Sequence, residues 1–158
     1  MAARQPPILA TVVAEWTGSD AWVFSSIEGT GPDDGYALAQ IIAKADRINH
    51  ALLTEAEFIQ AVPRLIAAGL IGAQAEADRY WQTEAGRALY QQRMKGRGLF
   101  GWMEAIPPAL HRLRRPQDTA WSLPAGVFDR ATQDWHERAR ALLKRHGGGR
   151  REQGEAPR

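Results

Sequence analysis

Leu53–Thr83 has the sequence LTEAEFIQAVPRLIAAGLIGAQAEADRYWQT, and its pattern organises the interpretation of the whole 158-residue chain. Thr54 and Glu57 stand three residues apart, as in a capping box, which predicts that a helix begins here. The apolar residues that follow share the three-and-four spacing of one buried helical stripe: Phe58, Ala61, Val62, Leu65 and Ile66. Gly69 then supplies the left-handed residue that often ends a helix, so we expect a helix over 54–68.

A β-hairpin is expected directly after this helix. Leu70 and Ile71 predict a short strand, and residues 75–78 predict a polar turn. Residues 79–82 predict the returning strand. Thr83 is suited to cap the next helix, because its hydroxyl can accept a hydrogen bond from a free amide of the first turn.

This order of elements resembles the winged helix-turn-helix domain of PadR-like and MarR-like transcriptional regulators. The resemblance covers residues 19–95 and depends on the helix, the Ala-Ala-Gly-Leu-Ile of 67–71, the two strands and the Thr-Glu-Ala-Gly-Arg-Ala-Leu of 83–89. In that family the helix before Gly-Leu-Ile lies in the DNA major groove and the hairpin is the wing. The resemblance implies a mainly α protein with a small β-hairpin (α+β), followed here by a C-terminal helical arm.

The segments before the central helix complete the expected helix-turn-helix. A short helix is expected within 8–16, and Ser19 or Asp20 is expected to cap a segment over 21–27. After a loop rich in glycine, Asp33 or Asp34 is expected to cap a helix over 34–46. Residues 47–50 would then link this helix to the one at 54–68.

The C-terminal half predicts further helices. We expect a helix over 83–95, a hinge at 96–98, two short helices that meet at Pro107-Pro108, and a long helix over 124–146. The long helix carries a seven-spaced seam of Phe128, Trp135 and Leu142, which favours a homodimer through 99–146. The predicted division is therefore 1–95 (core 19–95), 96–146 as a dimerisation arm, and 147–158 as a disordered tail.

The amino-acid composition limits the class to which the protein can belong. A hydrophobic content of 44% suits one core with a smaller appendage. The sequence has no run of eighteen apolar residues and no signal-peptide core at its start, so we expect a soluble, cytoplasmic protein that does not enter membranes. Cysteine is absent, which excludes disulfides and thiolate catalysis.

Motifs for catalysis and cofactor binding fail on inspection. Gly96, Gly98 and Gly101 match a dinucleotide fingerprint literally, but the end of a helix precedes them where a strand is needed. His136 and Glu137 resemble the start of a zinc motif, yet Arg140 occupies the place of the second histidine. We therefore expect no enzyme, cofactor or metal. The six tryptophans suggest a small aromatic effector only weakly, because large aromatic side chains in a chain of this size are mostly core.

The first functional hypothesis is a DNA-binding transcriptional regulator with double-stranded DNA as its partner. On a helical wheel, Pro63 points outward with the base-reading candidates of the central helix. The residues expected to contact DNA are Arg47, Asn49 and His50 on phosphates, Thr54, Gln60 and Arg64 on the outer face of the helix, and Arg79 on the wing.

The alternative hypothesis is a winged-helix fold used as a protein–protein interaction module without specific DNA binding. Glu55, Glu57, Glu76 and Asp78 lie where phosphates would approach, and binding to phosphates depends on cations. Residues 1–90 hold six Lys/Arg and eleven Asp/Glu, whereas 91–158 hold fourteen and seven, so the two halves carry −5 and +7. This asymmetry favours contacts between proteins.

Overall fold

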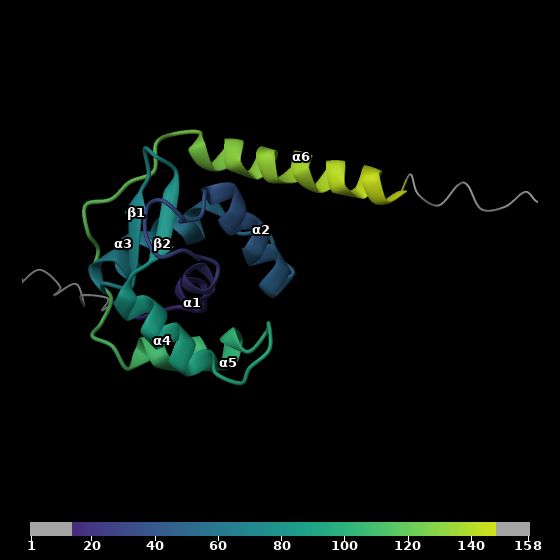
Figure 1. The fold of residues 1–158 in the computed structure, drawn as a ribbon. Coiled ribbons are helices and arrows are strands. Elements are labelled where there is room, and N and C mark those ends of the chain that lie inside the picture. Colours follow the sequence, from purple (N-terminus) through teal and green to yellow (C-terminus); the bar gives the residue numbers. More distant parts are fainter. Residues whose placement is uncertain (1–13, 148–158) are drawn as a thin grey trace, which may run out of the picture.

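A computed structural model describes residues 14–147, which form six helices and one two-stranded antiparallel sheet (Figure 1). The elements are α1 (Gly18–Ser25), α2 (Leu38–Asn49), α3 (Glu55–Ala67), β1 (Ile71–Gln74), β2 (Arg79–Gln82), α4 (Glu84–Met94), α5 (Trp102–His111) and α6 (Val127–Gly147). A mainly α chain with a small β-hairpin is therefore confirmed. The helix expected within 8–16 falls almost entirely outside the described residues, as does the tail expected to be disordered; residues 14–17 precede α1 without helical structure.

The central helix and hairpin form as expected. The Thr54 hydroxyl accepts from the Glu57 amide, and the Glu57 carboxylate accepts from the Thr54 amide, which completes the capping box. Gly69 has a φ of 73°, the left-handed conformation that ends α3. The strands pair in a register that sets Ile71 opposite Gln82 and Gln74 opposite Arg79.

The start of α1 differs from the expectation. Thr17 caps α1 through a capping box with Asp20, so neither Ser19 nor Asp20 is the cap. Asp20 is instead the third residue of the helix, where its carboxylate accepts from the Thr17 amide at 2.9 Å. A threonine followed three residues later by an acid satisfies two free amides at once, which makes the earlier start the more stable one.

The expected cap of α2 at Asp33 or Asp34 is wrong. Asp34 accepts hydrogen bonds from the amides of Thr30 and Gly31, which closes the preceding loop. The chain then forms an isolated antiparallel bridge between Tyr36 and Tyr80 before α2 begins at Leu38. The other end differs as well: residues 47–49 of the expected linker belong to α2, and His50 caps its C-terminal end with a φ of 49°.

The prediction of two short helices meeting at the proline pair is also wrong. Pro107 and Pro108 lie inside a single helix, α5, although each lacks an amide donor. Ile106 and Leu110 on either side of the pair are fully buried, and α5 packs along α1. Burial of this face offsets the lost hydrogen bonds.

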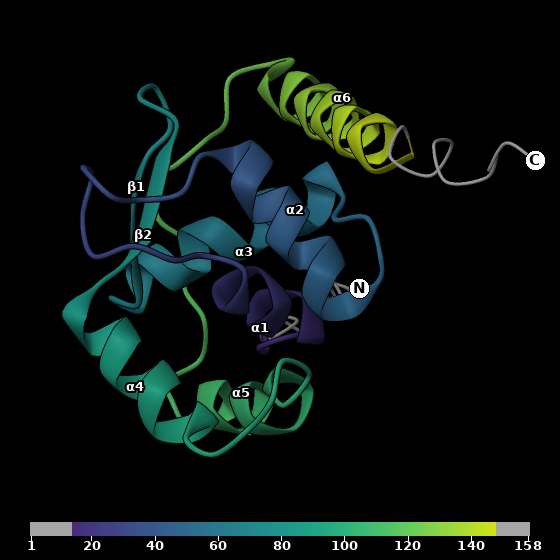
Figure 2. The same cartoon turned by 45° about the vertical axis from the view of Figure 1, so that its right-hand side comes forward.

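The core is built around α1, which packs against α2, α3 and α5 (Figure 2). One continuous apolar cluster extends from Trp16 to Phe128 and includes Trp102, Ile106 and Leu110 of α5. The boundary expected at residue 95 therefore does not separate two cores.

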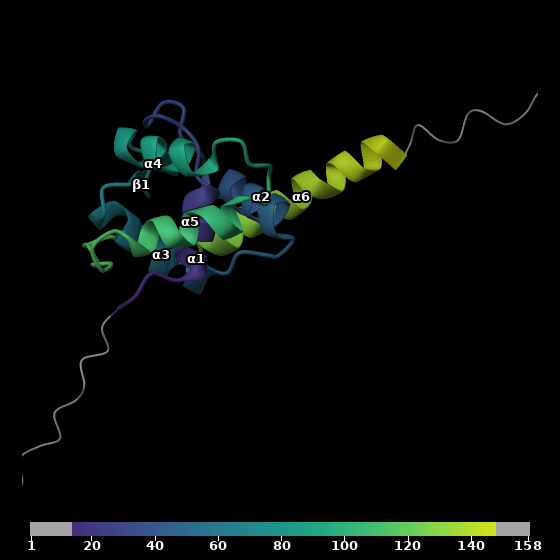
Figure 3. The same cartoon turned by 90° about the horizontal axis from the view of Figure 1, so that it is seen from below.

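Two parts of the C-terminal half bear on the function of the protein. Residues 112–126, here called the crossing segment, run from α5 past α3 and the hairpin to α6 (Figure 1). The distal half of α6 extends well beyond the rest of the fold (Figure 3). Within residues 14–147, none of the helices combines the length and apolar content needed to span a membrane.

Candidate functional site

Base recognition is expected on the outer face of α3, and the crossing segment packs against one flank of this helix while Ala56, Ile59 and Gln60 stay exposed. Trp121 packs edge-on against Phe58 with ring centroids 5.9 Å apart, and Asp118 lies 4.0 Å from the Arg64 side chain. Pro63 is buried. The expectation that Pro63 points outward is therefore wrong, because a helical wheel represents one helix alone and not the segments that pack against it.

Arg64 is held by the protein itself. Its Nη1 donates to Oδ2 of Asp20 at 3.2 Å and to the backbone oxygen of Glu15 at 3.1 Å. The Arg64 side chain is 11% exposed and that of Asp20 is fully buried. The guanidinium thus joins α3 to the start of α1 and lies close to the crossing segment. An arginine engaged in this way is not free to form a bidentate contact with a base.

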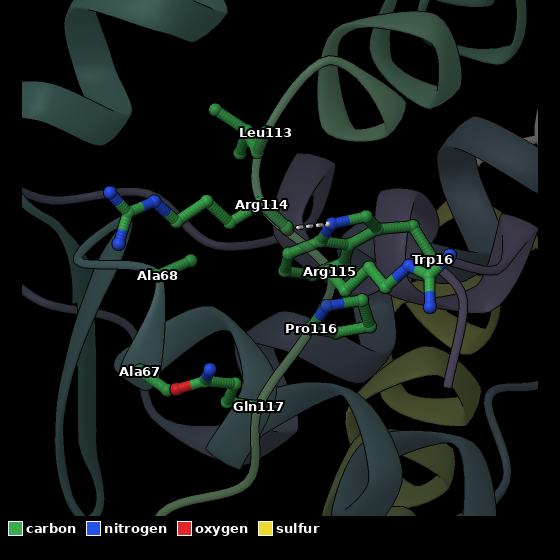
Figure 4. Close-up of a pocket in the computed structure, with 8 residues that line it drawn as sticks. All are labelled: Trp16, Ala67, Ala68, Leu113, Arg114, Arg115, Pro116 and Gln117. Atoms are coloured by element: carbon green, nitrogen blue, oxygen red, sulfur yellow. Dashed lines mark hydrogen bonds between the residues drawn. The ribbon is translucent and has the colours of Figure 1, made fainter. Parts of the chain in front are cut away.

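A cavity of about 310 Å³ lies at the C-terminal end of α3, between Ala67, Ala68, Trp16 and residues 113–117 (Figure 4). The Trp16 indole Nε1 donates to the backbone oxygen of Arg114 at 3.0 Å, which fixes the crossing segment to the segment before α1. The side chains of Arg114 and Arg115 extend in opposite directions. They do not converge on a common point, so the cavity does not form an anion site.

The remaining predicted DNA contacts are spread over the surface. Gln60 and Arg47 are exposed, on α3 and α2 respectively. His50 is exposed, with its ring centroid 5.3 Å from that of Phe100. Asn49 is half-buried beside the turn between α2 and α3, and Thr54 serves as the cap of α3. Asn49 and Thr54 line one cavity beside the α2–α3 turn, and the charged residue of that cavity among those described is the acid Glu57.

The tip of the β1–β2 hairpin has a structural role that the sequence pattern does not predict. Asp78 has a φ of 52°, and its Oδ1 accepts from the amide of Leu38 at 2.9 Å. The carboxylate therefore satisfies a free amide at the start of α2 and ties the hairpin to that helix. Arg79 donates to the backbone oxygen of Asp78 at 3.0 Å. No local sequence pattern predicts this cap, because Leu38 and Asp78 lie far apart in the sequence.

The proximal half of α6 covers α2. Phe128 is buried, and Ala131 and Trp135 pack partly buried against the core. A shallow cavity between the tip of the β1–β2 hairpin, α2 and α6 is lined by Ala39, Asp78 and Arg130, among others. Figure 2 shows α6 lying beside α2. The first half of the seven-spaced seam is therefore used within the chain.

A polar cluster on the other side of the hairpin is structural in character. Glu28 accepts from Lys44 Nζ at 2.5 Å and from the Tyr36 hydroxyl at 2.7 Å. Burial opposes ionisation of Glu28, but the hydrogen bonds from Lys44 and Tyr36 outweigh it and lower the pKa of the carboxyl. Burial and the same hydrogen bond raise the pKa of Tyr36 to about 12. This cluster pairs its charges internally, as a fold-stabilising network does.

Comparison with known proteins assigns no function, so the function has to be inferred from the geometry. The chain matches no protein-family model, no curated protein and no solved structure. Over residues 14–147 no group of three or more His, Asp or Glu side chains is arranged to hold a metal ion.

Proposed function

We propose that this chain is a winged-helix fold used as a protein–protein interaction module without sequence-specific DNA binding. The order of α1, the Tyr36–Tyr80 bridge, α2, α3 and the β1–β2 hairpin supports the winged-helix arrangement. In this arrangement α2 and α3 form the helix-turn-helix pair, and the hairpin is the wing.

The observation that carries the proposal is that the chain covers part of the surface that would read DNA, and that Arg64 on this surface is already bound by Asp20. A helix-turn-helix protein inserts its second helix into the major groove while the first helix crosses the backbone. Here the crossing segment lies against the flank of α3 that carries Arg64, and the proximal half of α6 lies against α2. A duplex approaching this face would meet the C-terminal half of the same chain.

Charge supports the same proposal. Glu55 and Glu57 lie in the first turn of α3, and Glu76 is exposed at the wing tip. Carboxylates at these positions repel phosphates, and Arg64 cannot compensate because Asp20 already binds it. A surface of this kind favours a protein partner.

The alternative, a DNA-binding regulator, is favoured by the exposure of Arg47 and Gln60, which remain available on α2 and α3. Under that hypothesis Gln60→Ala would relax sequence preference, and Arg47→Ala would weaken binding to all sequences alike. The two functions therefore make different predictions for the same DNA-binding experiment.

The deciding experiment is an electrophoretic mobility shift at physiological salt with a pool of random duplexes, on the full chain and on residues 1–146. We expect no sequence to be enriched. Weak binding by the full chain should largely disappear in 1–146, because residues 147–158 carry three arginines. Enrichment of a defined, preferably palindromic sequence by both proteins would overturn the proposal in favour of the regulator.

A further inference from the structure

The exposed large apolar side chains of residues 14–147 gather in two places, with Ile59 on α3 as the exception. The first place is the surface beside the α2–α3 turn, where Leu52, Leu99, Phe100 and Met103 are each between 45% and 48% exposed. The second is the distal half of α6, where Leu142 is 58% exposed and Leu143 is 74% exposed. Exposed apolar patches of this kind mark contact surfaces.

Two of these side chains, Leu52 and Met103, line a groove between the start of α1, the α2–α3 turn and α5, which we call the apolar groove. Leu52 and Met103 line it together with Trp22, Trp102 and Pro107, around a volume of about 510 Å³. The indole Nε1 atoms of Trp22 and Trp102 donate to the backbone oxygens of Ala45 and Ile48. Both tryptophans therefore present ring carbons to the groove and need no polar partner there.

The charge of the groove is acidic. Among its lining residues in the described part of the chain, Glu57 is the charged one. Its carboxylate accepts hydrogen bonds from the Thr54 amide and the Ser19 hydroxyl, which hold it at the edge of the groove. An occupant of this groove should therefore combine apolar side chains with positive charge.

The distal arm, residues 138–147 of α6, has these properties. The apolar stripe of α6 packs against the core at Phe128 and Trp135, but it continues past the edge of the fold to Leu142 and Leu143. Residues 138–147 contain Arg138, Arg140, Lys144 and Arg145 and no carboxylate. This is an amphipathic, basic helix whose apolar side lacks a cover within residues 14–147.

We propose that the apolar groove of one copy receives the distal arm of a second copy, so that two chains exchange arms reciprocally. Figures 1 and 2 place α6 and α5 on opposite sides of the fold, with the distal arm pointing away from its own groove. Leu142 and Leu143 would enter the groove, and the arm's cations would lie near Glu57. The inference rests on the proposed interaction function and names a second copy as the partner.

The first test is sedimentation of the full chain over a range of concentrations up to high micromolar. We expect a dimer for the unmodified protein. The groove variant Leu52→Ser with Met103→Ser and the arm variant Leu142→Ser with Leu143→Ser should each be monomeric at concentrations where the unmodified chain is dimeric. Ile59→Ser is the matched control, because it removes an apolar side chain exposed to 39% outside both surfaces, and it should remain a dimer.

Mixing the two variants separates this proposal from direct pairing of α6 helices. One partner then has an intact groove and the other an intact arm, so a heterodimer with one contact should form, more weakly than the unmodified dimer. If the groove variant remains dimeric while the arm variant is monomeric, the arms pair with each other and the proposal is wrong. A monomeric unmodified chain at all concentrations overturns it as well.

A chain lacking residues 1–13 tests a different occupant. If this chain dimerises through the groove while the full chain does not, the N-terminal segment is the competitor and the second-copy proposal is wrong. The mobility-shift result is independent of these outcomes. Specific DNA binding would overturn the proposed function, whereas a monomer that ignores DNA would overturn the arm exchange alone.

Discussion

At the scale of the residue, Arg64 shows how a side chain suited to DNA serves the fold instead. The helical wheel places Arg64 on the outer face of α3, and the structure agrees that it lies off the apolar stripe. What the wheel lacks is Asp20, fully buried on α1, and Asp118 on the crossing segment. The sequence therefore predicted the helix and its apolar stripe, but it did not predict that Asp20 and Asp118 lie beside Arg64.

We predict that Arg64→Ala destabilises the protein by about 3–5 kcal/mol, because it leaves the buried Asp20 carboxylate without its cation. Chemical denaturation of the full chain measures the loss. Gln60→Ala, one turn away and exposed, is the control and should change the free energy of unfolding by less than about 0.5 kcal/mol. Equal, small effects of the two substitutions would mean that the ion pair does not form.

At the scale of the element, local signals were predictable and remote ones were not. The caps at Thr54 and Thr83 were found because each partner lies within one turn of the sequence. The cap of α2 was not predicted because Asp78 lies in the β1–β2 turn, 40 residues after Leu38 in the sequence. The crossing segment was missed for the same reason, since its residues have no regular period.

Gly69 ends α3 by conformation alone. Its φ is 73°, and an added Cβ would meet no heavy atom within 4 Å among the residues described. We predict that Gly69→Val costs about 1–3 kcal/mol through backbone strain. Gly69→Asn should cost clearly less, because asparagine tolerates the left-handed region. Thermal melting compares the two variants, and similar melting temperatures would contradict a left-handed end at this position.

At Gly86 the constraint on the side chain is lack of space and not backbone conformation. It lies buried in the first turn of α4, and an added Cβ would stand 2.0 Å from the backbone oxygen of Leu70. We predict that Gly86→Ala destabilises the fold by about 1–3 kcal/mol, since α4 must move away from the hairpin. Ala85 is an exposed neighbour, so Ala85→Gly is the control. It should cost at most about 1 kcal/mol, through helix propensity alone.

At the scale of the whole molecule, the three tyrosines respond to pH together. Burial raises the pKa of Tyr36 to about 12, with a contribution from Glu28, and burial also raises the pKa of Tyr80 and Tyr90. The unfolded chain loses these protons near pH 10. Between pH 10 and 12 the folded state therefore binds more protons, and the free energy of unfolding falls as pH rises.

We expect the tyrosinate absorbance of the folded protein to develop well above the ordinary range, and to appear at once when denaturant is added at the same pH. Tyr36→Phe removes one of the three titrating groups and should reduce the slope of stability against pH in this window. A native titration that matches the unfolded one would show that the phenols are not shielded.

The hydrogen bond from Trp16 to Arg114 joins residues 98 apart in sequence, and the core cluster ends only at Phe128. A chain emerging from the ribosome cannot close this core until the crossing segment has left the exit tunnel. Until then α1 and α3 lack their last cover, and the nascent chain exposes the apolar surfaces on which chaperones act. The emergence of residues 112–128 therefore sets the moment at which this core can close.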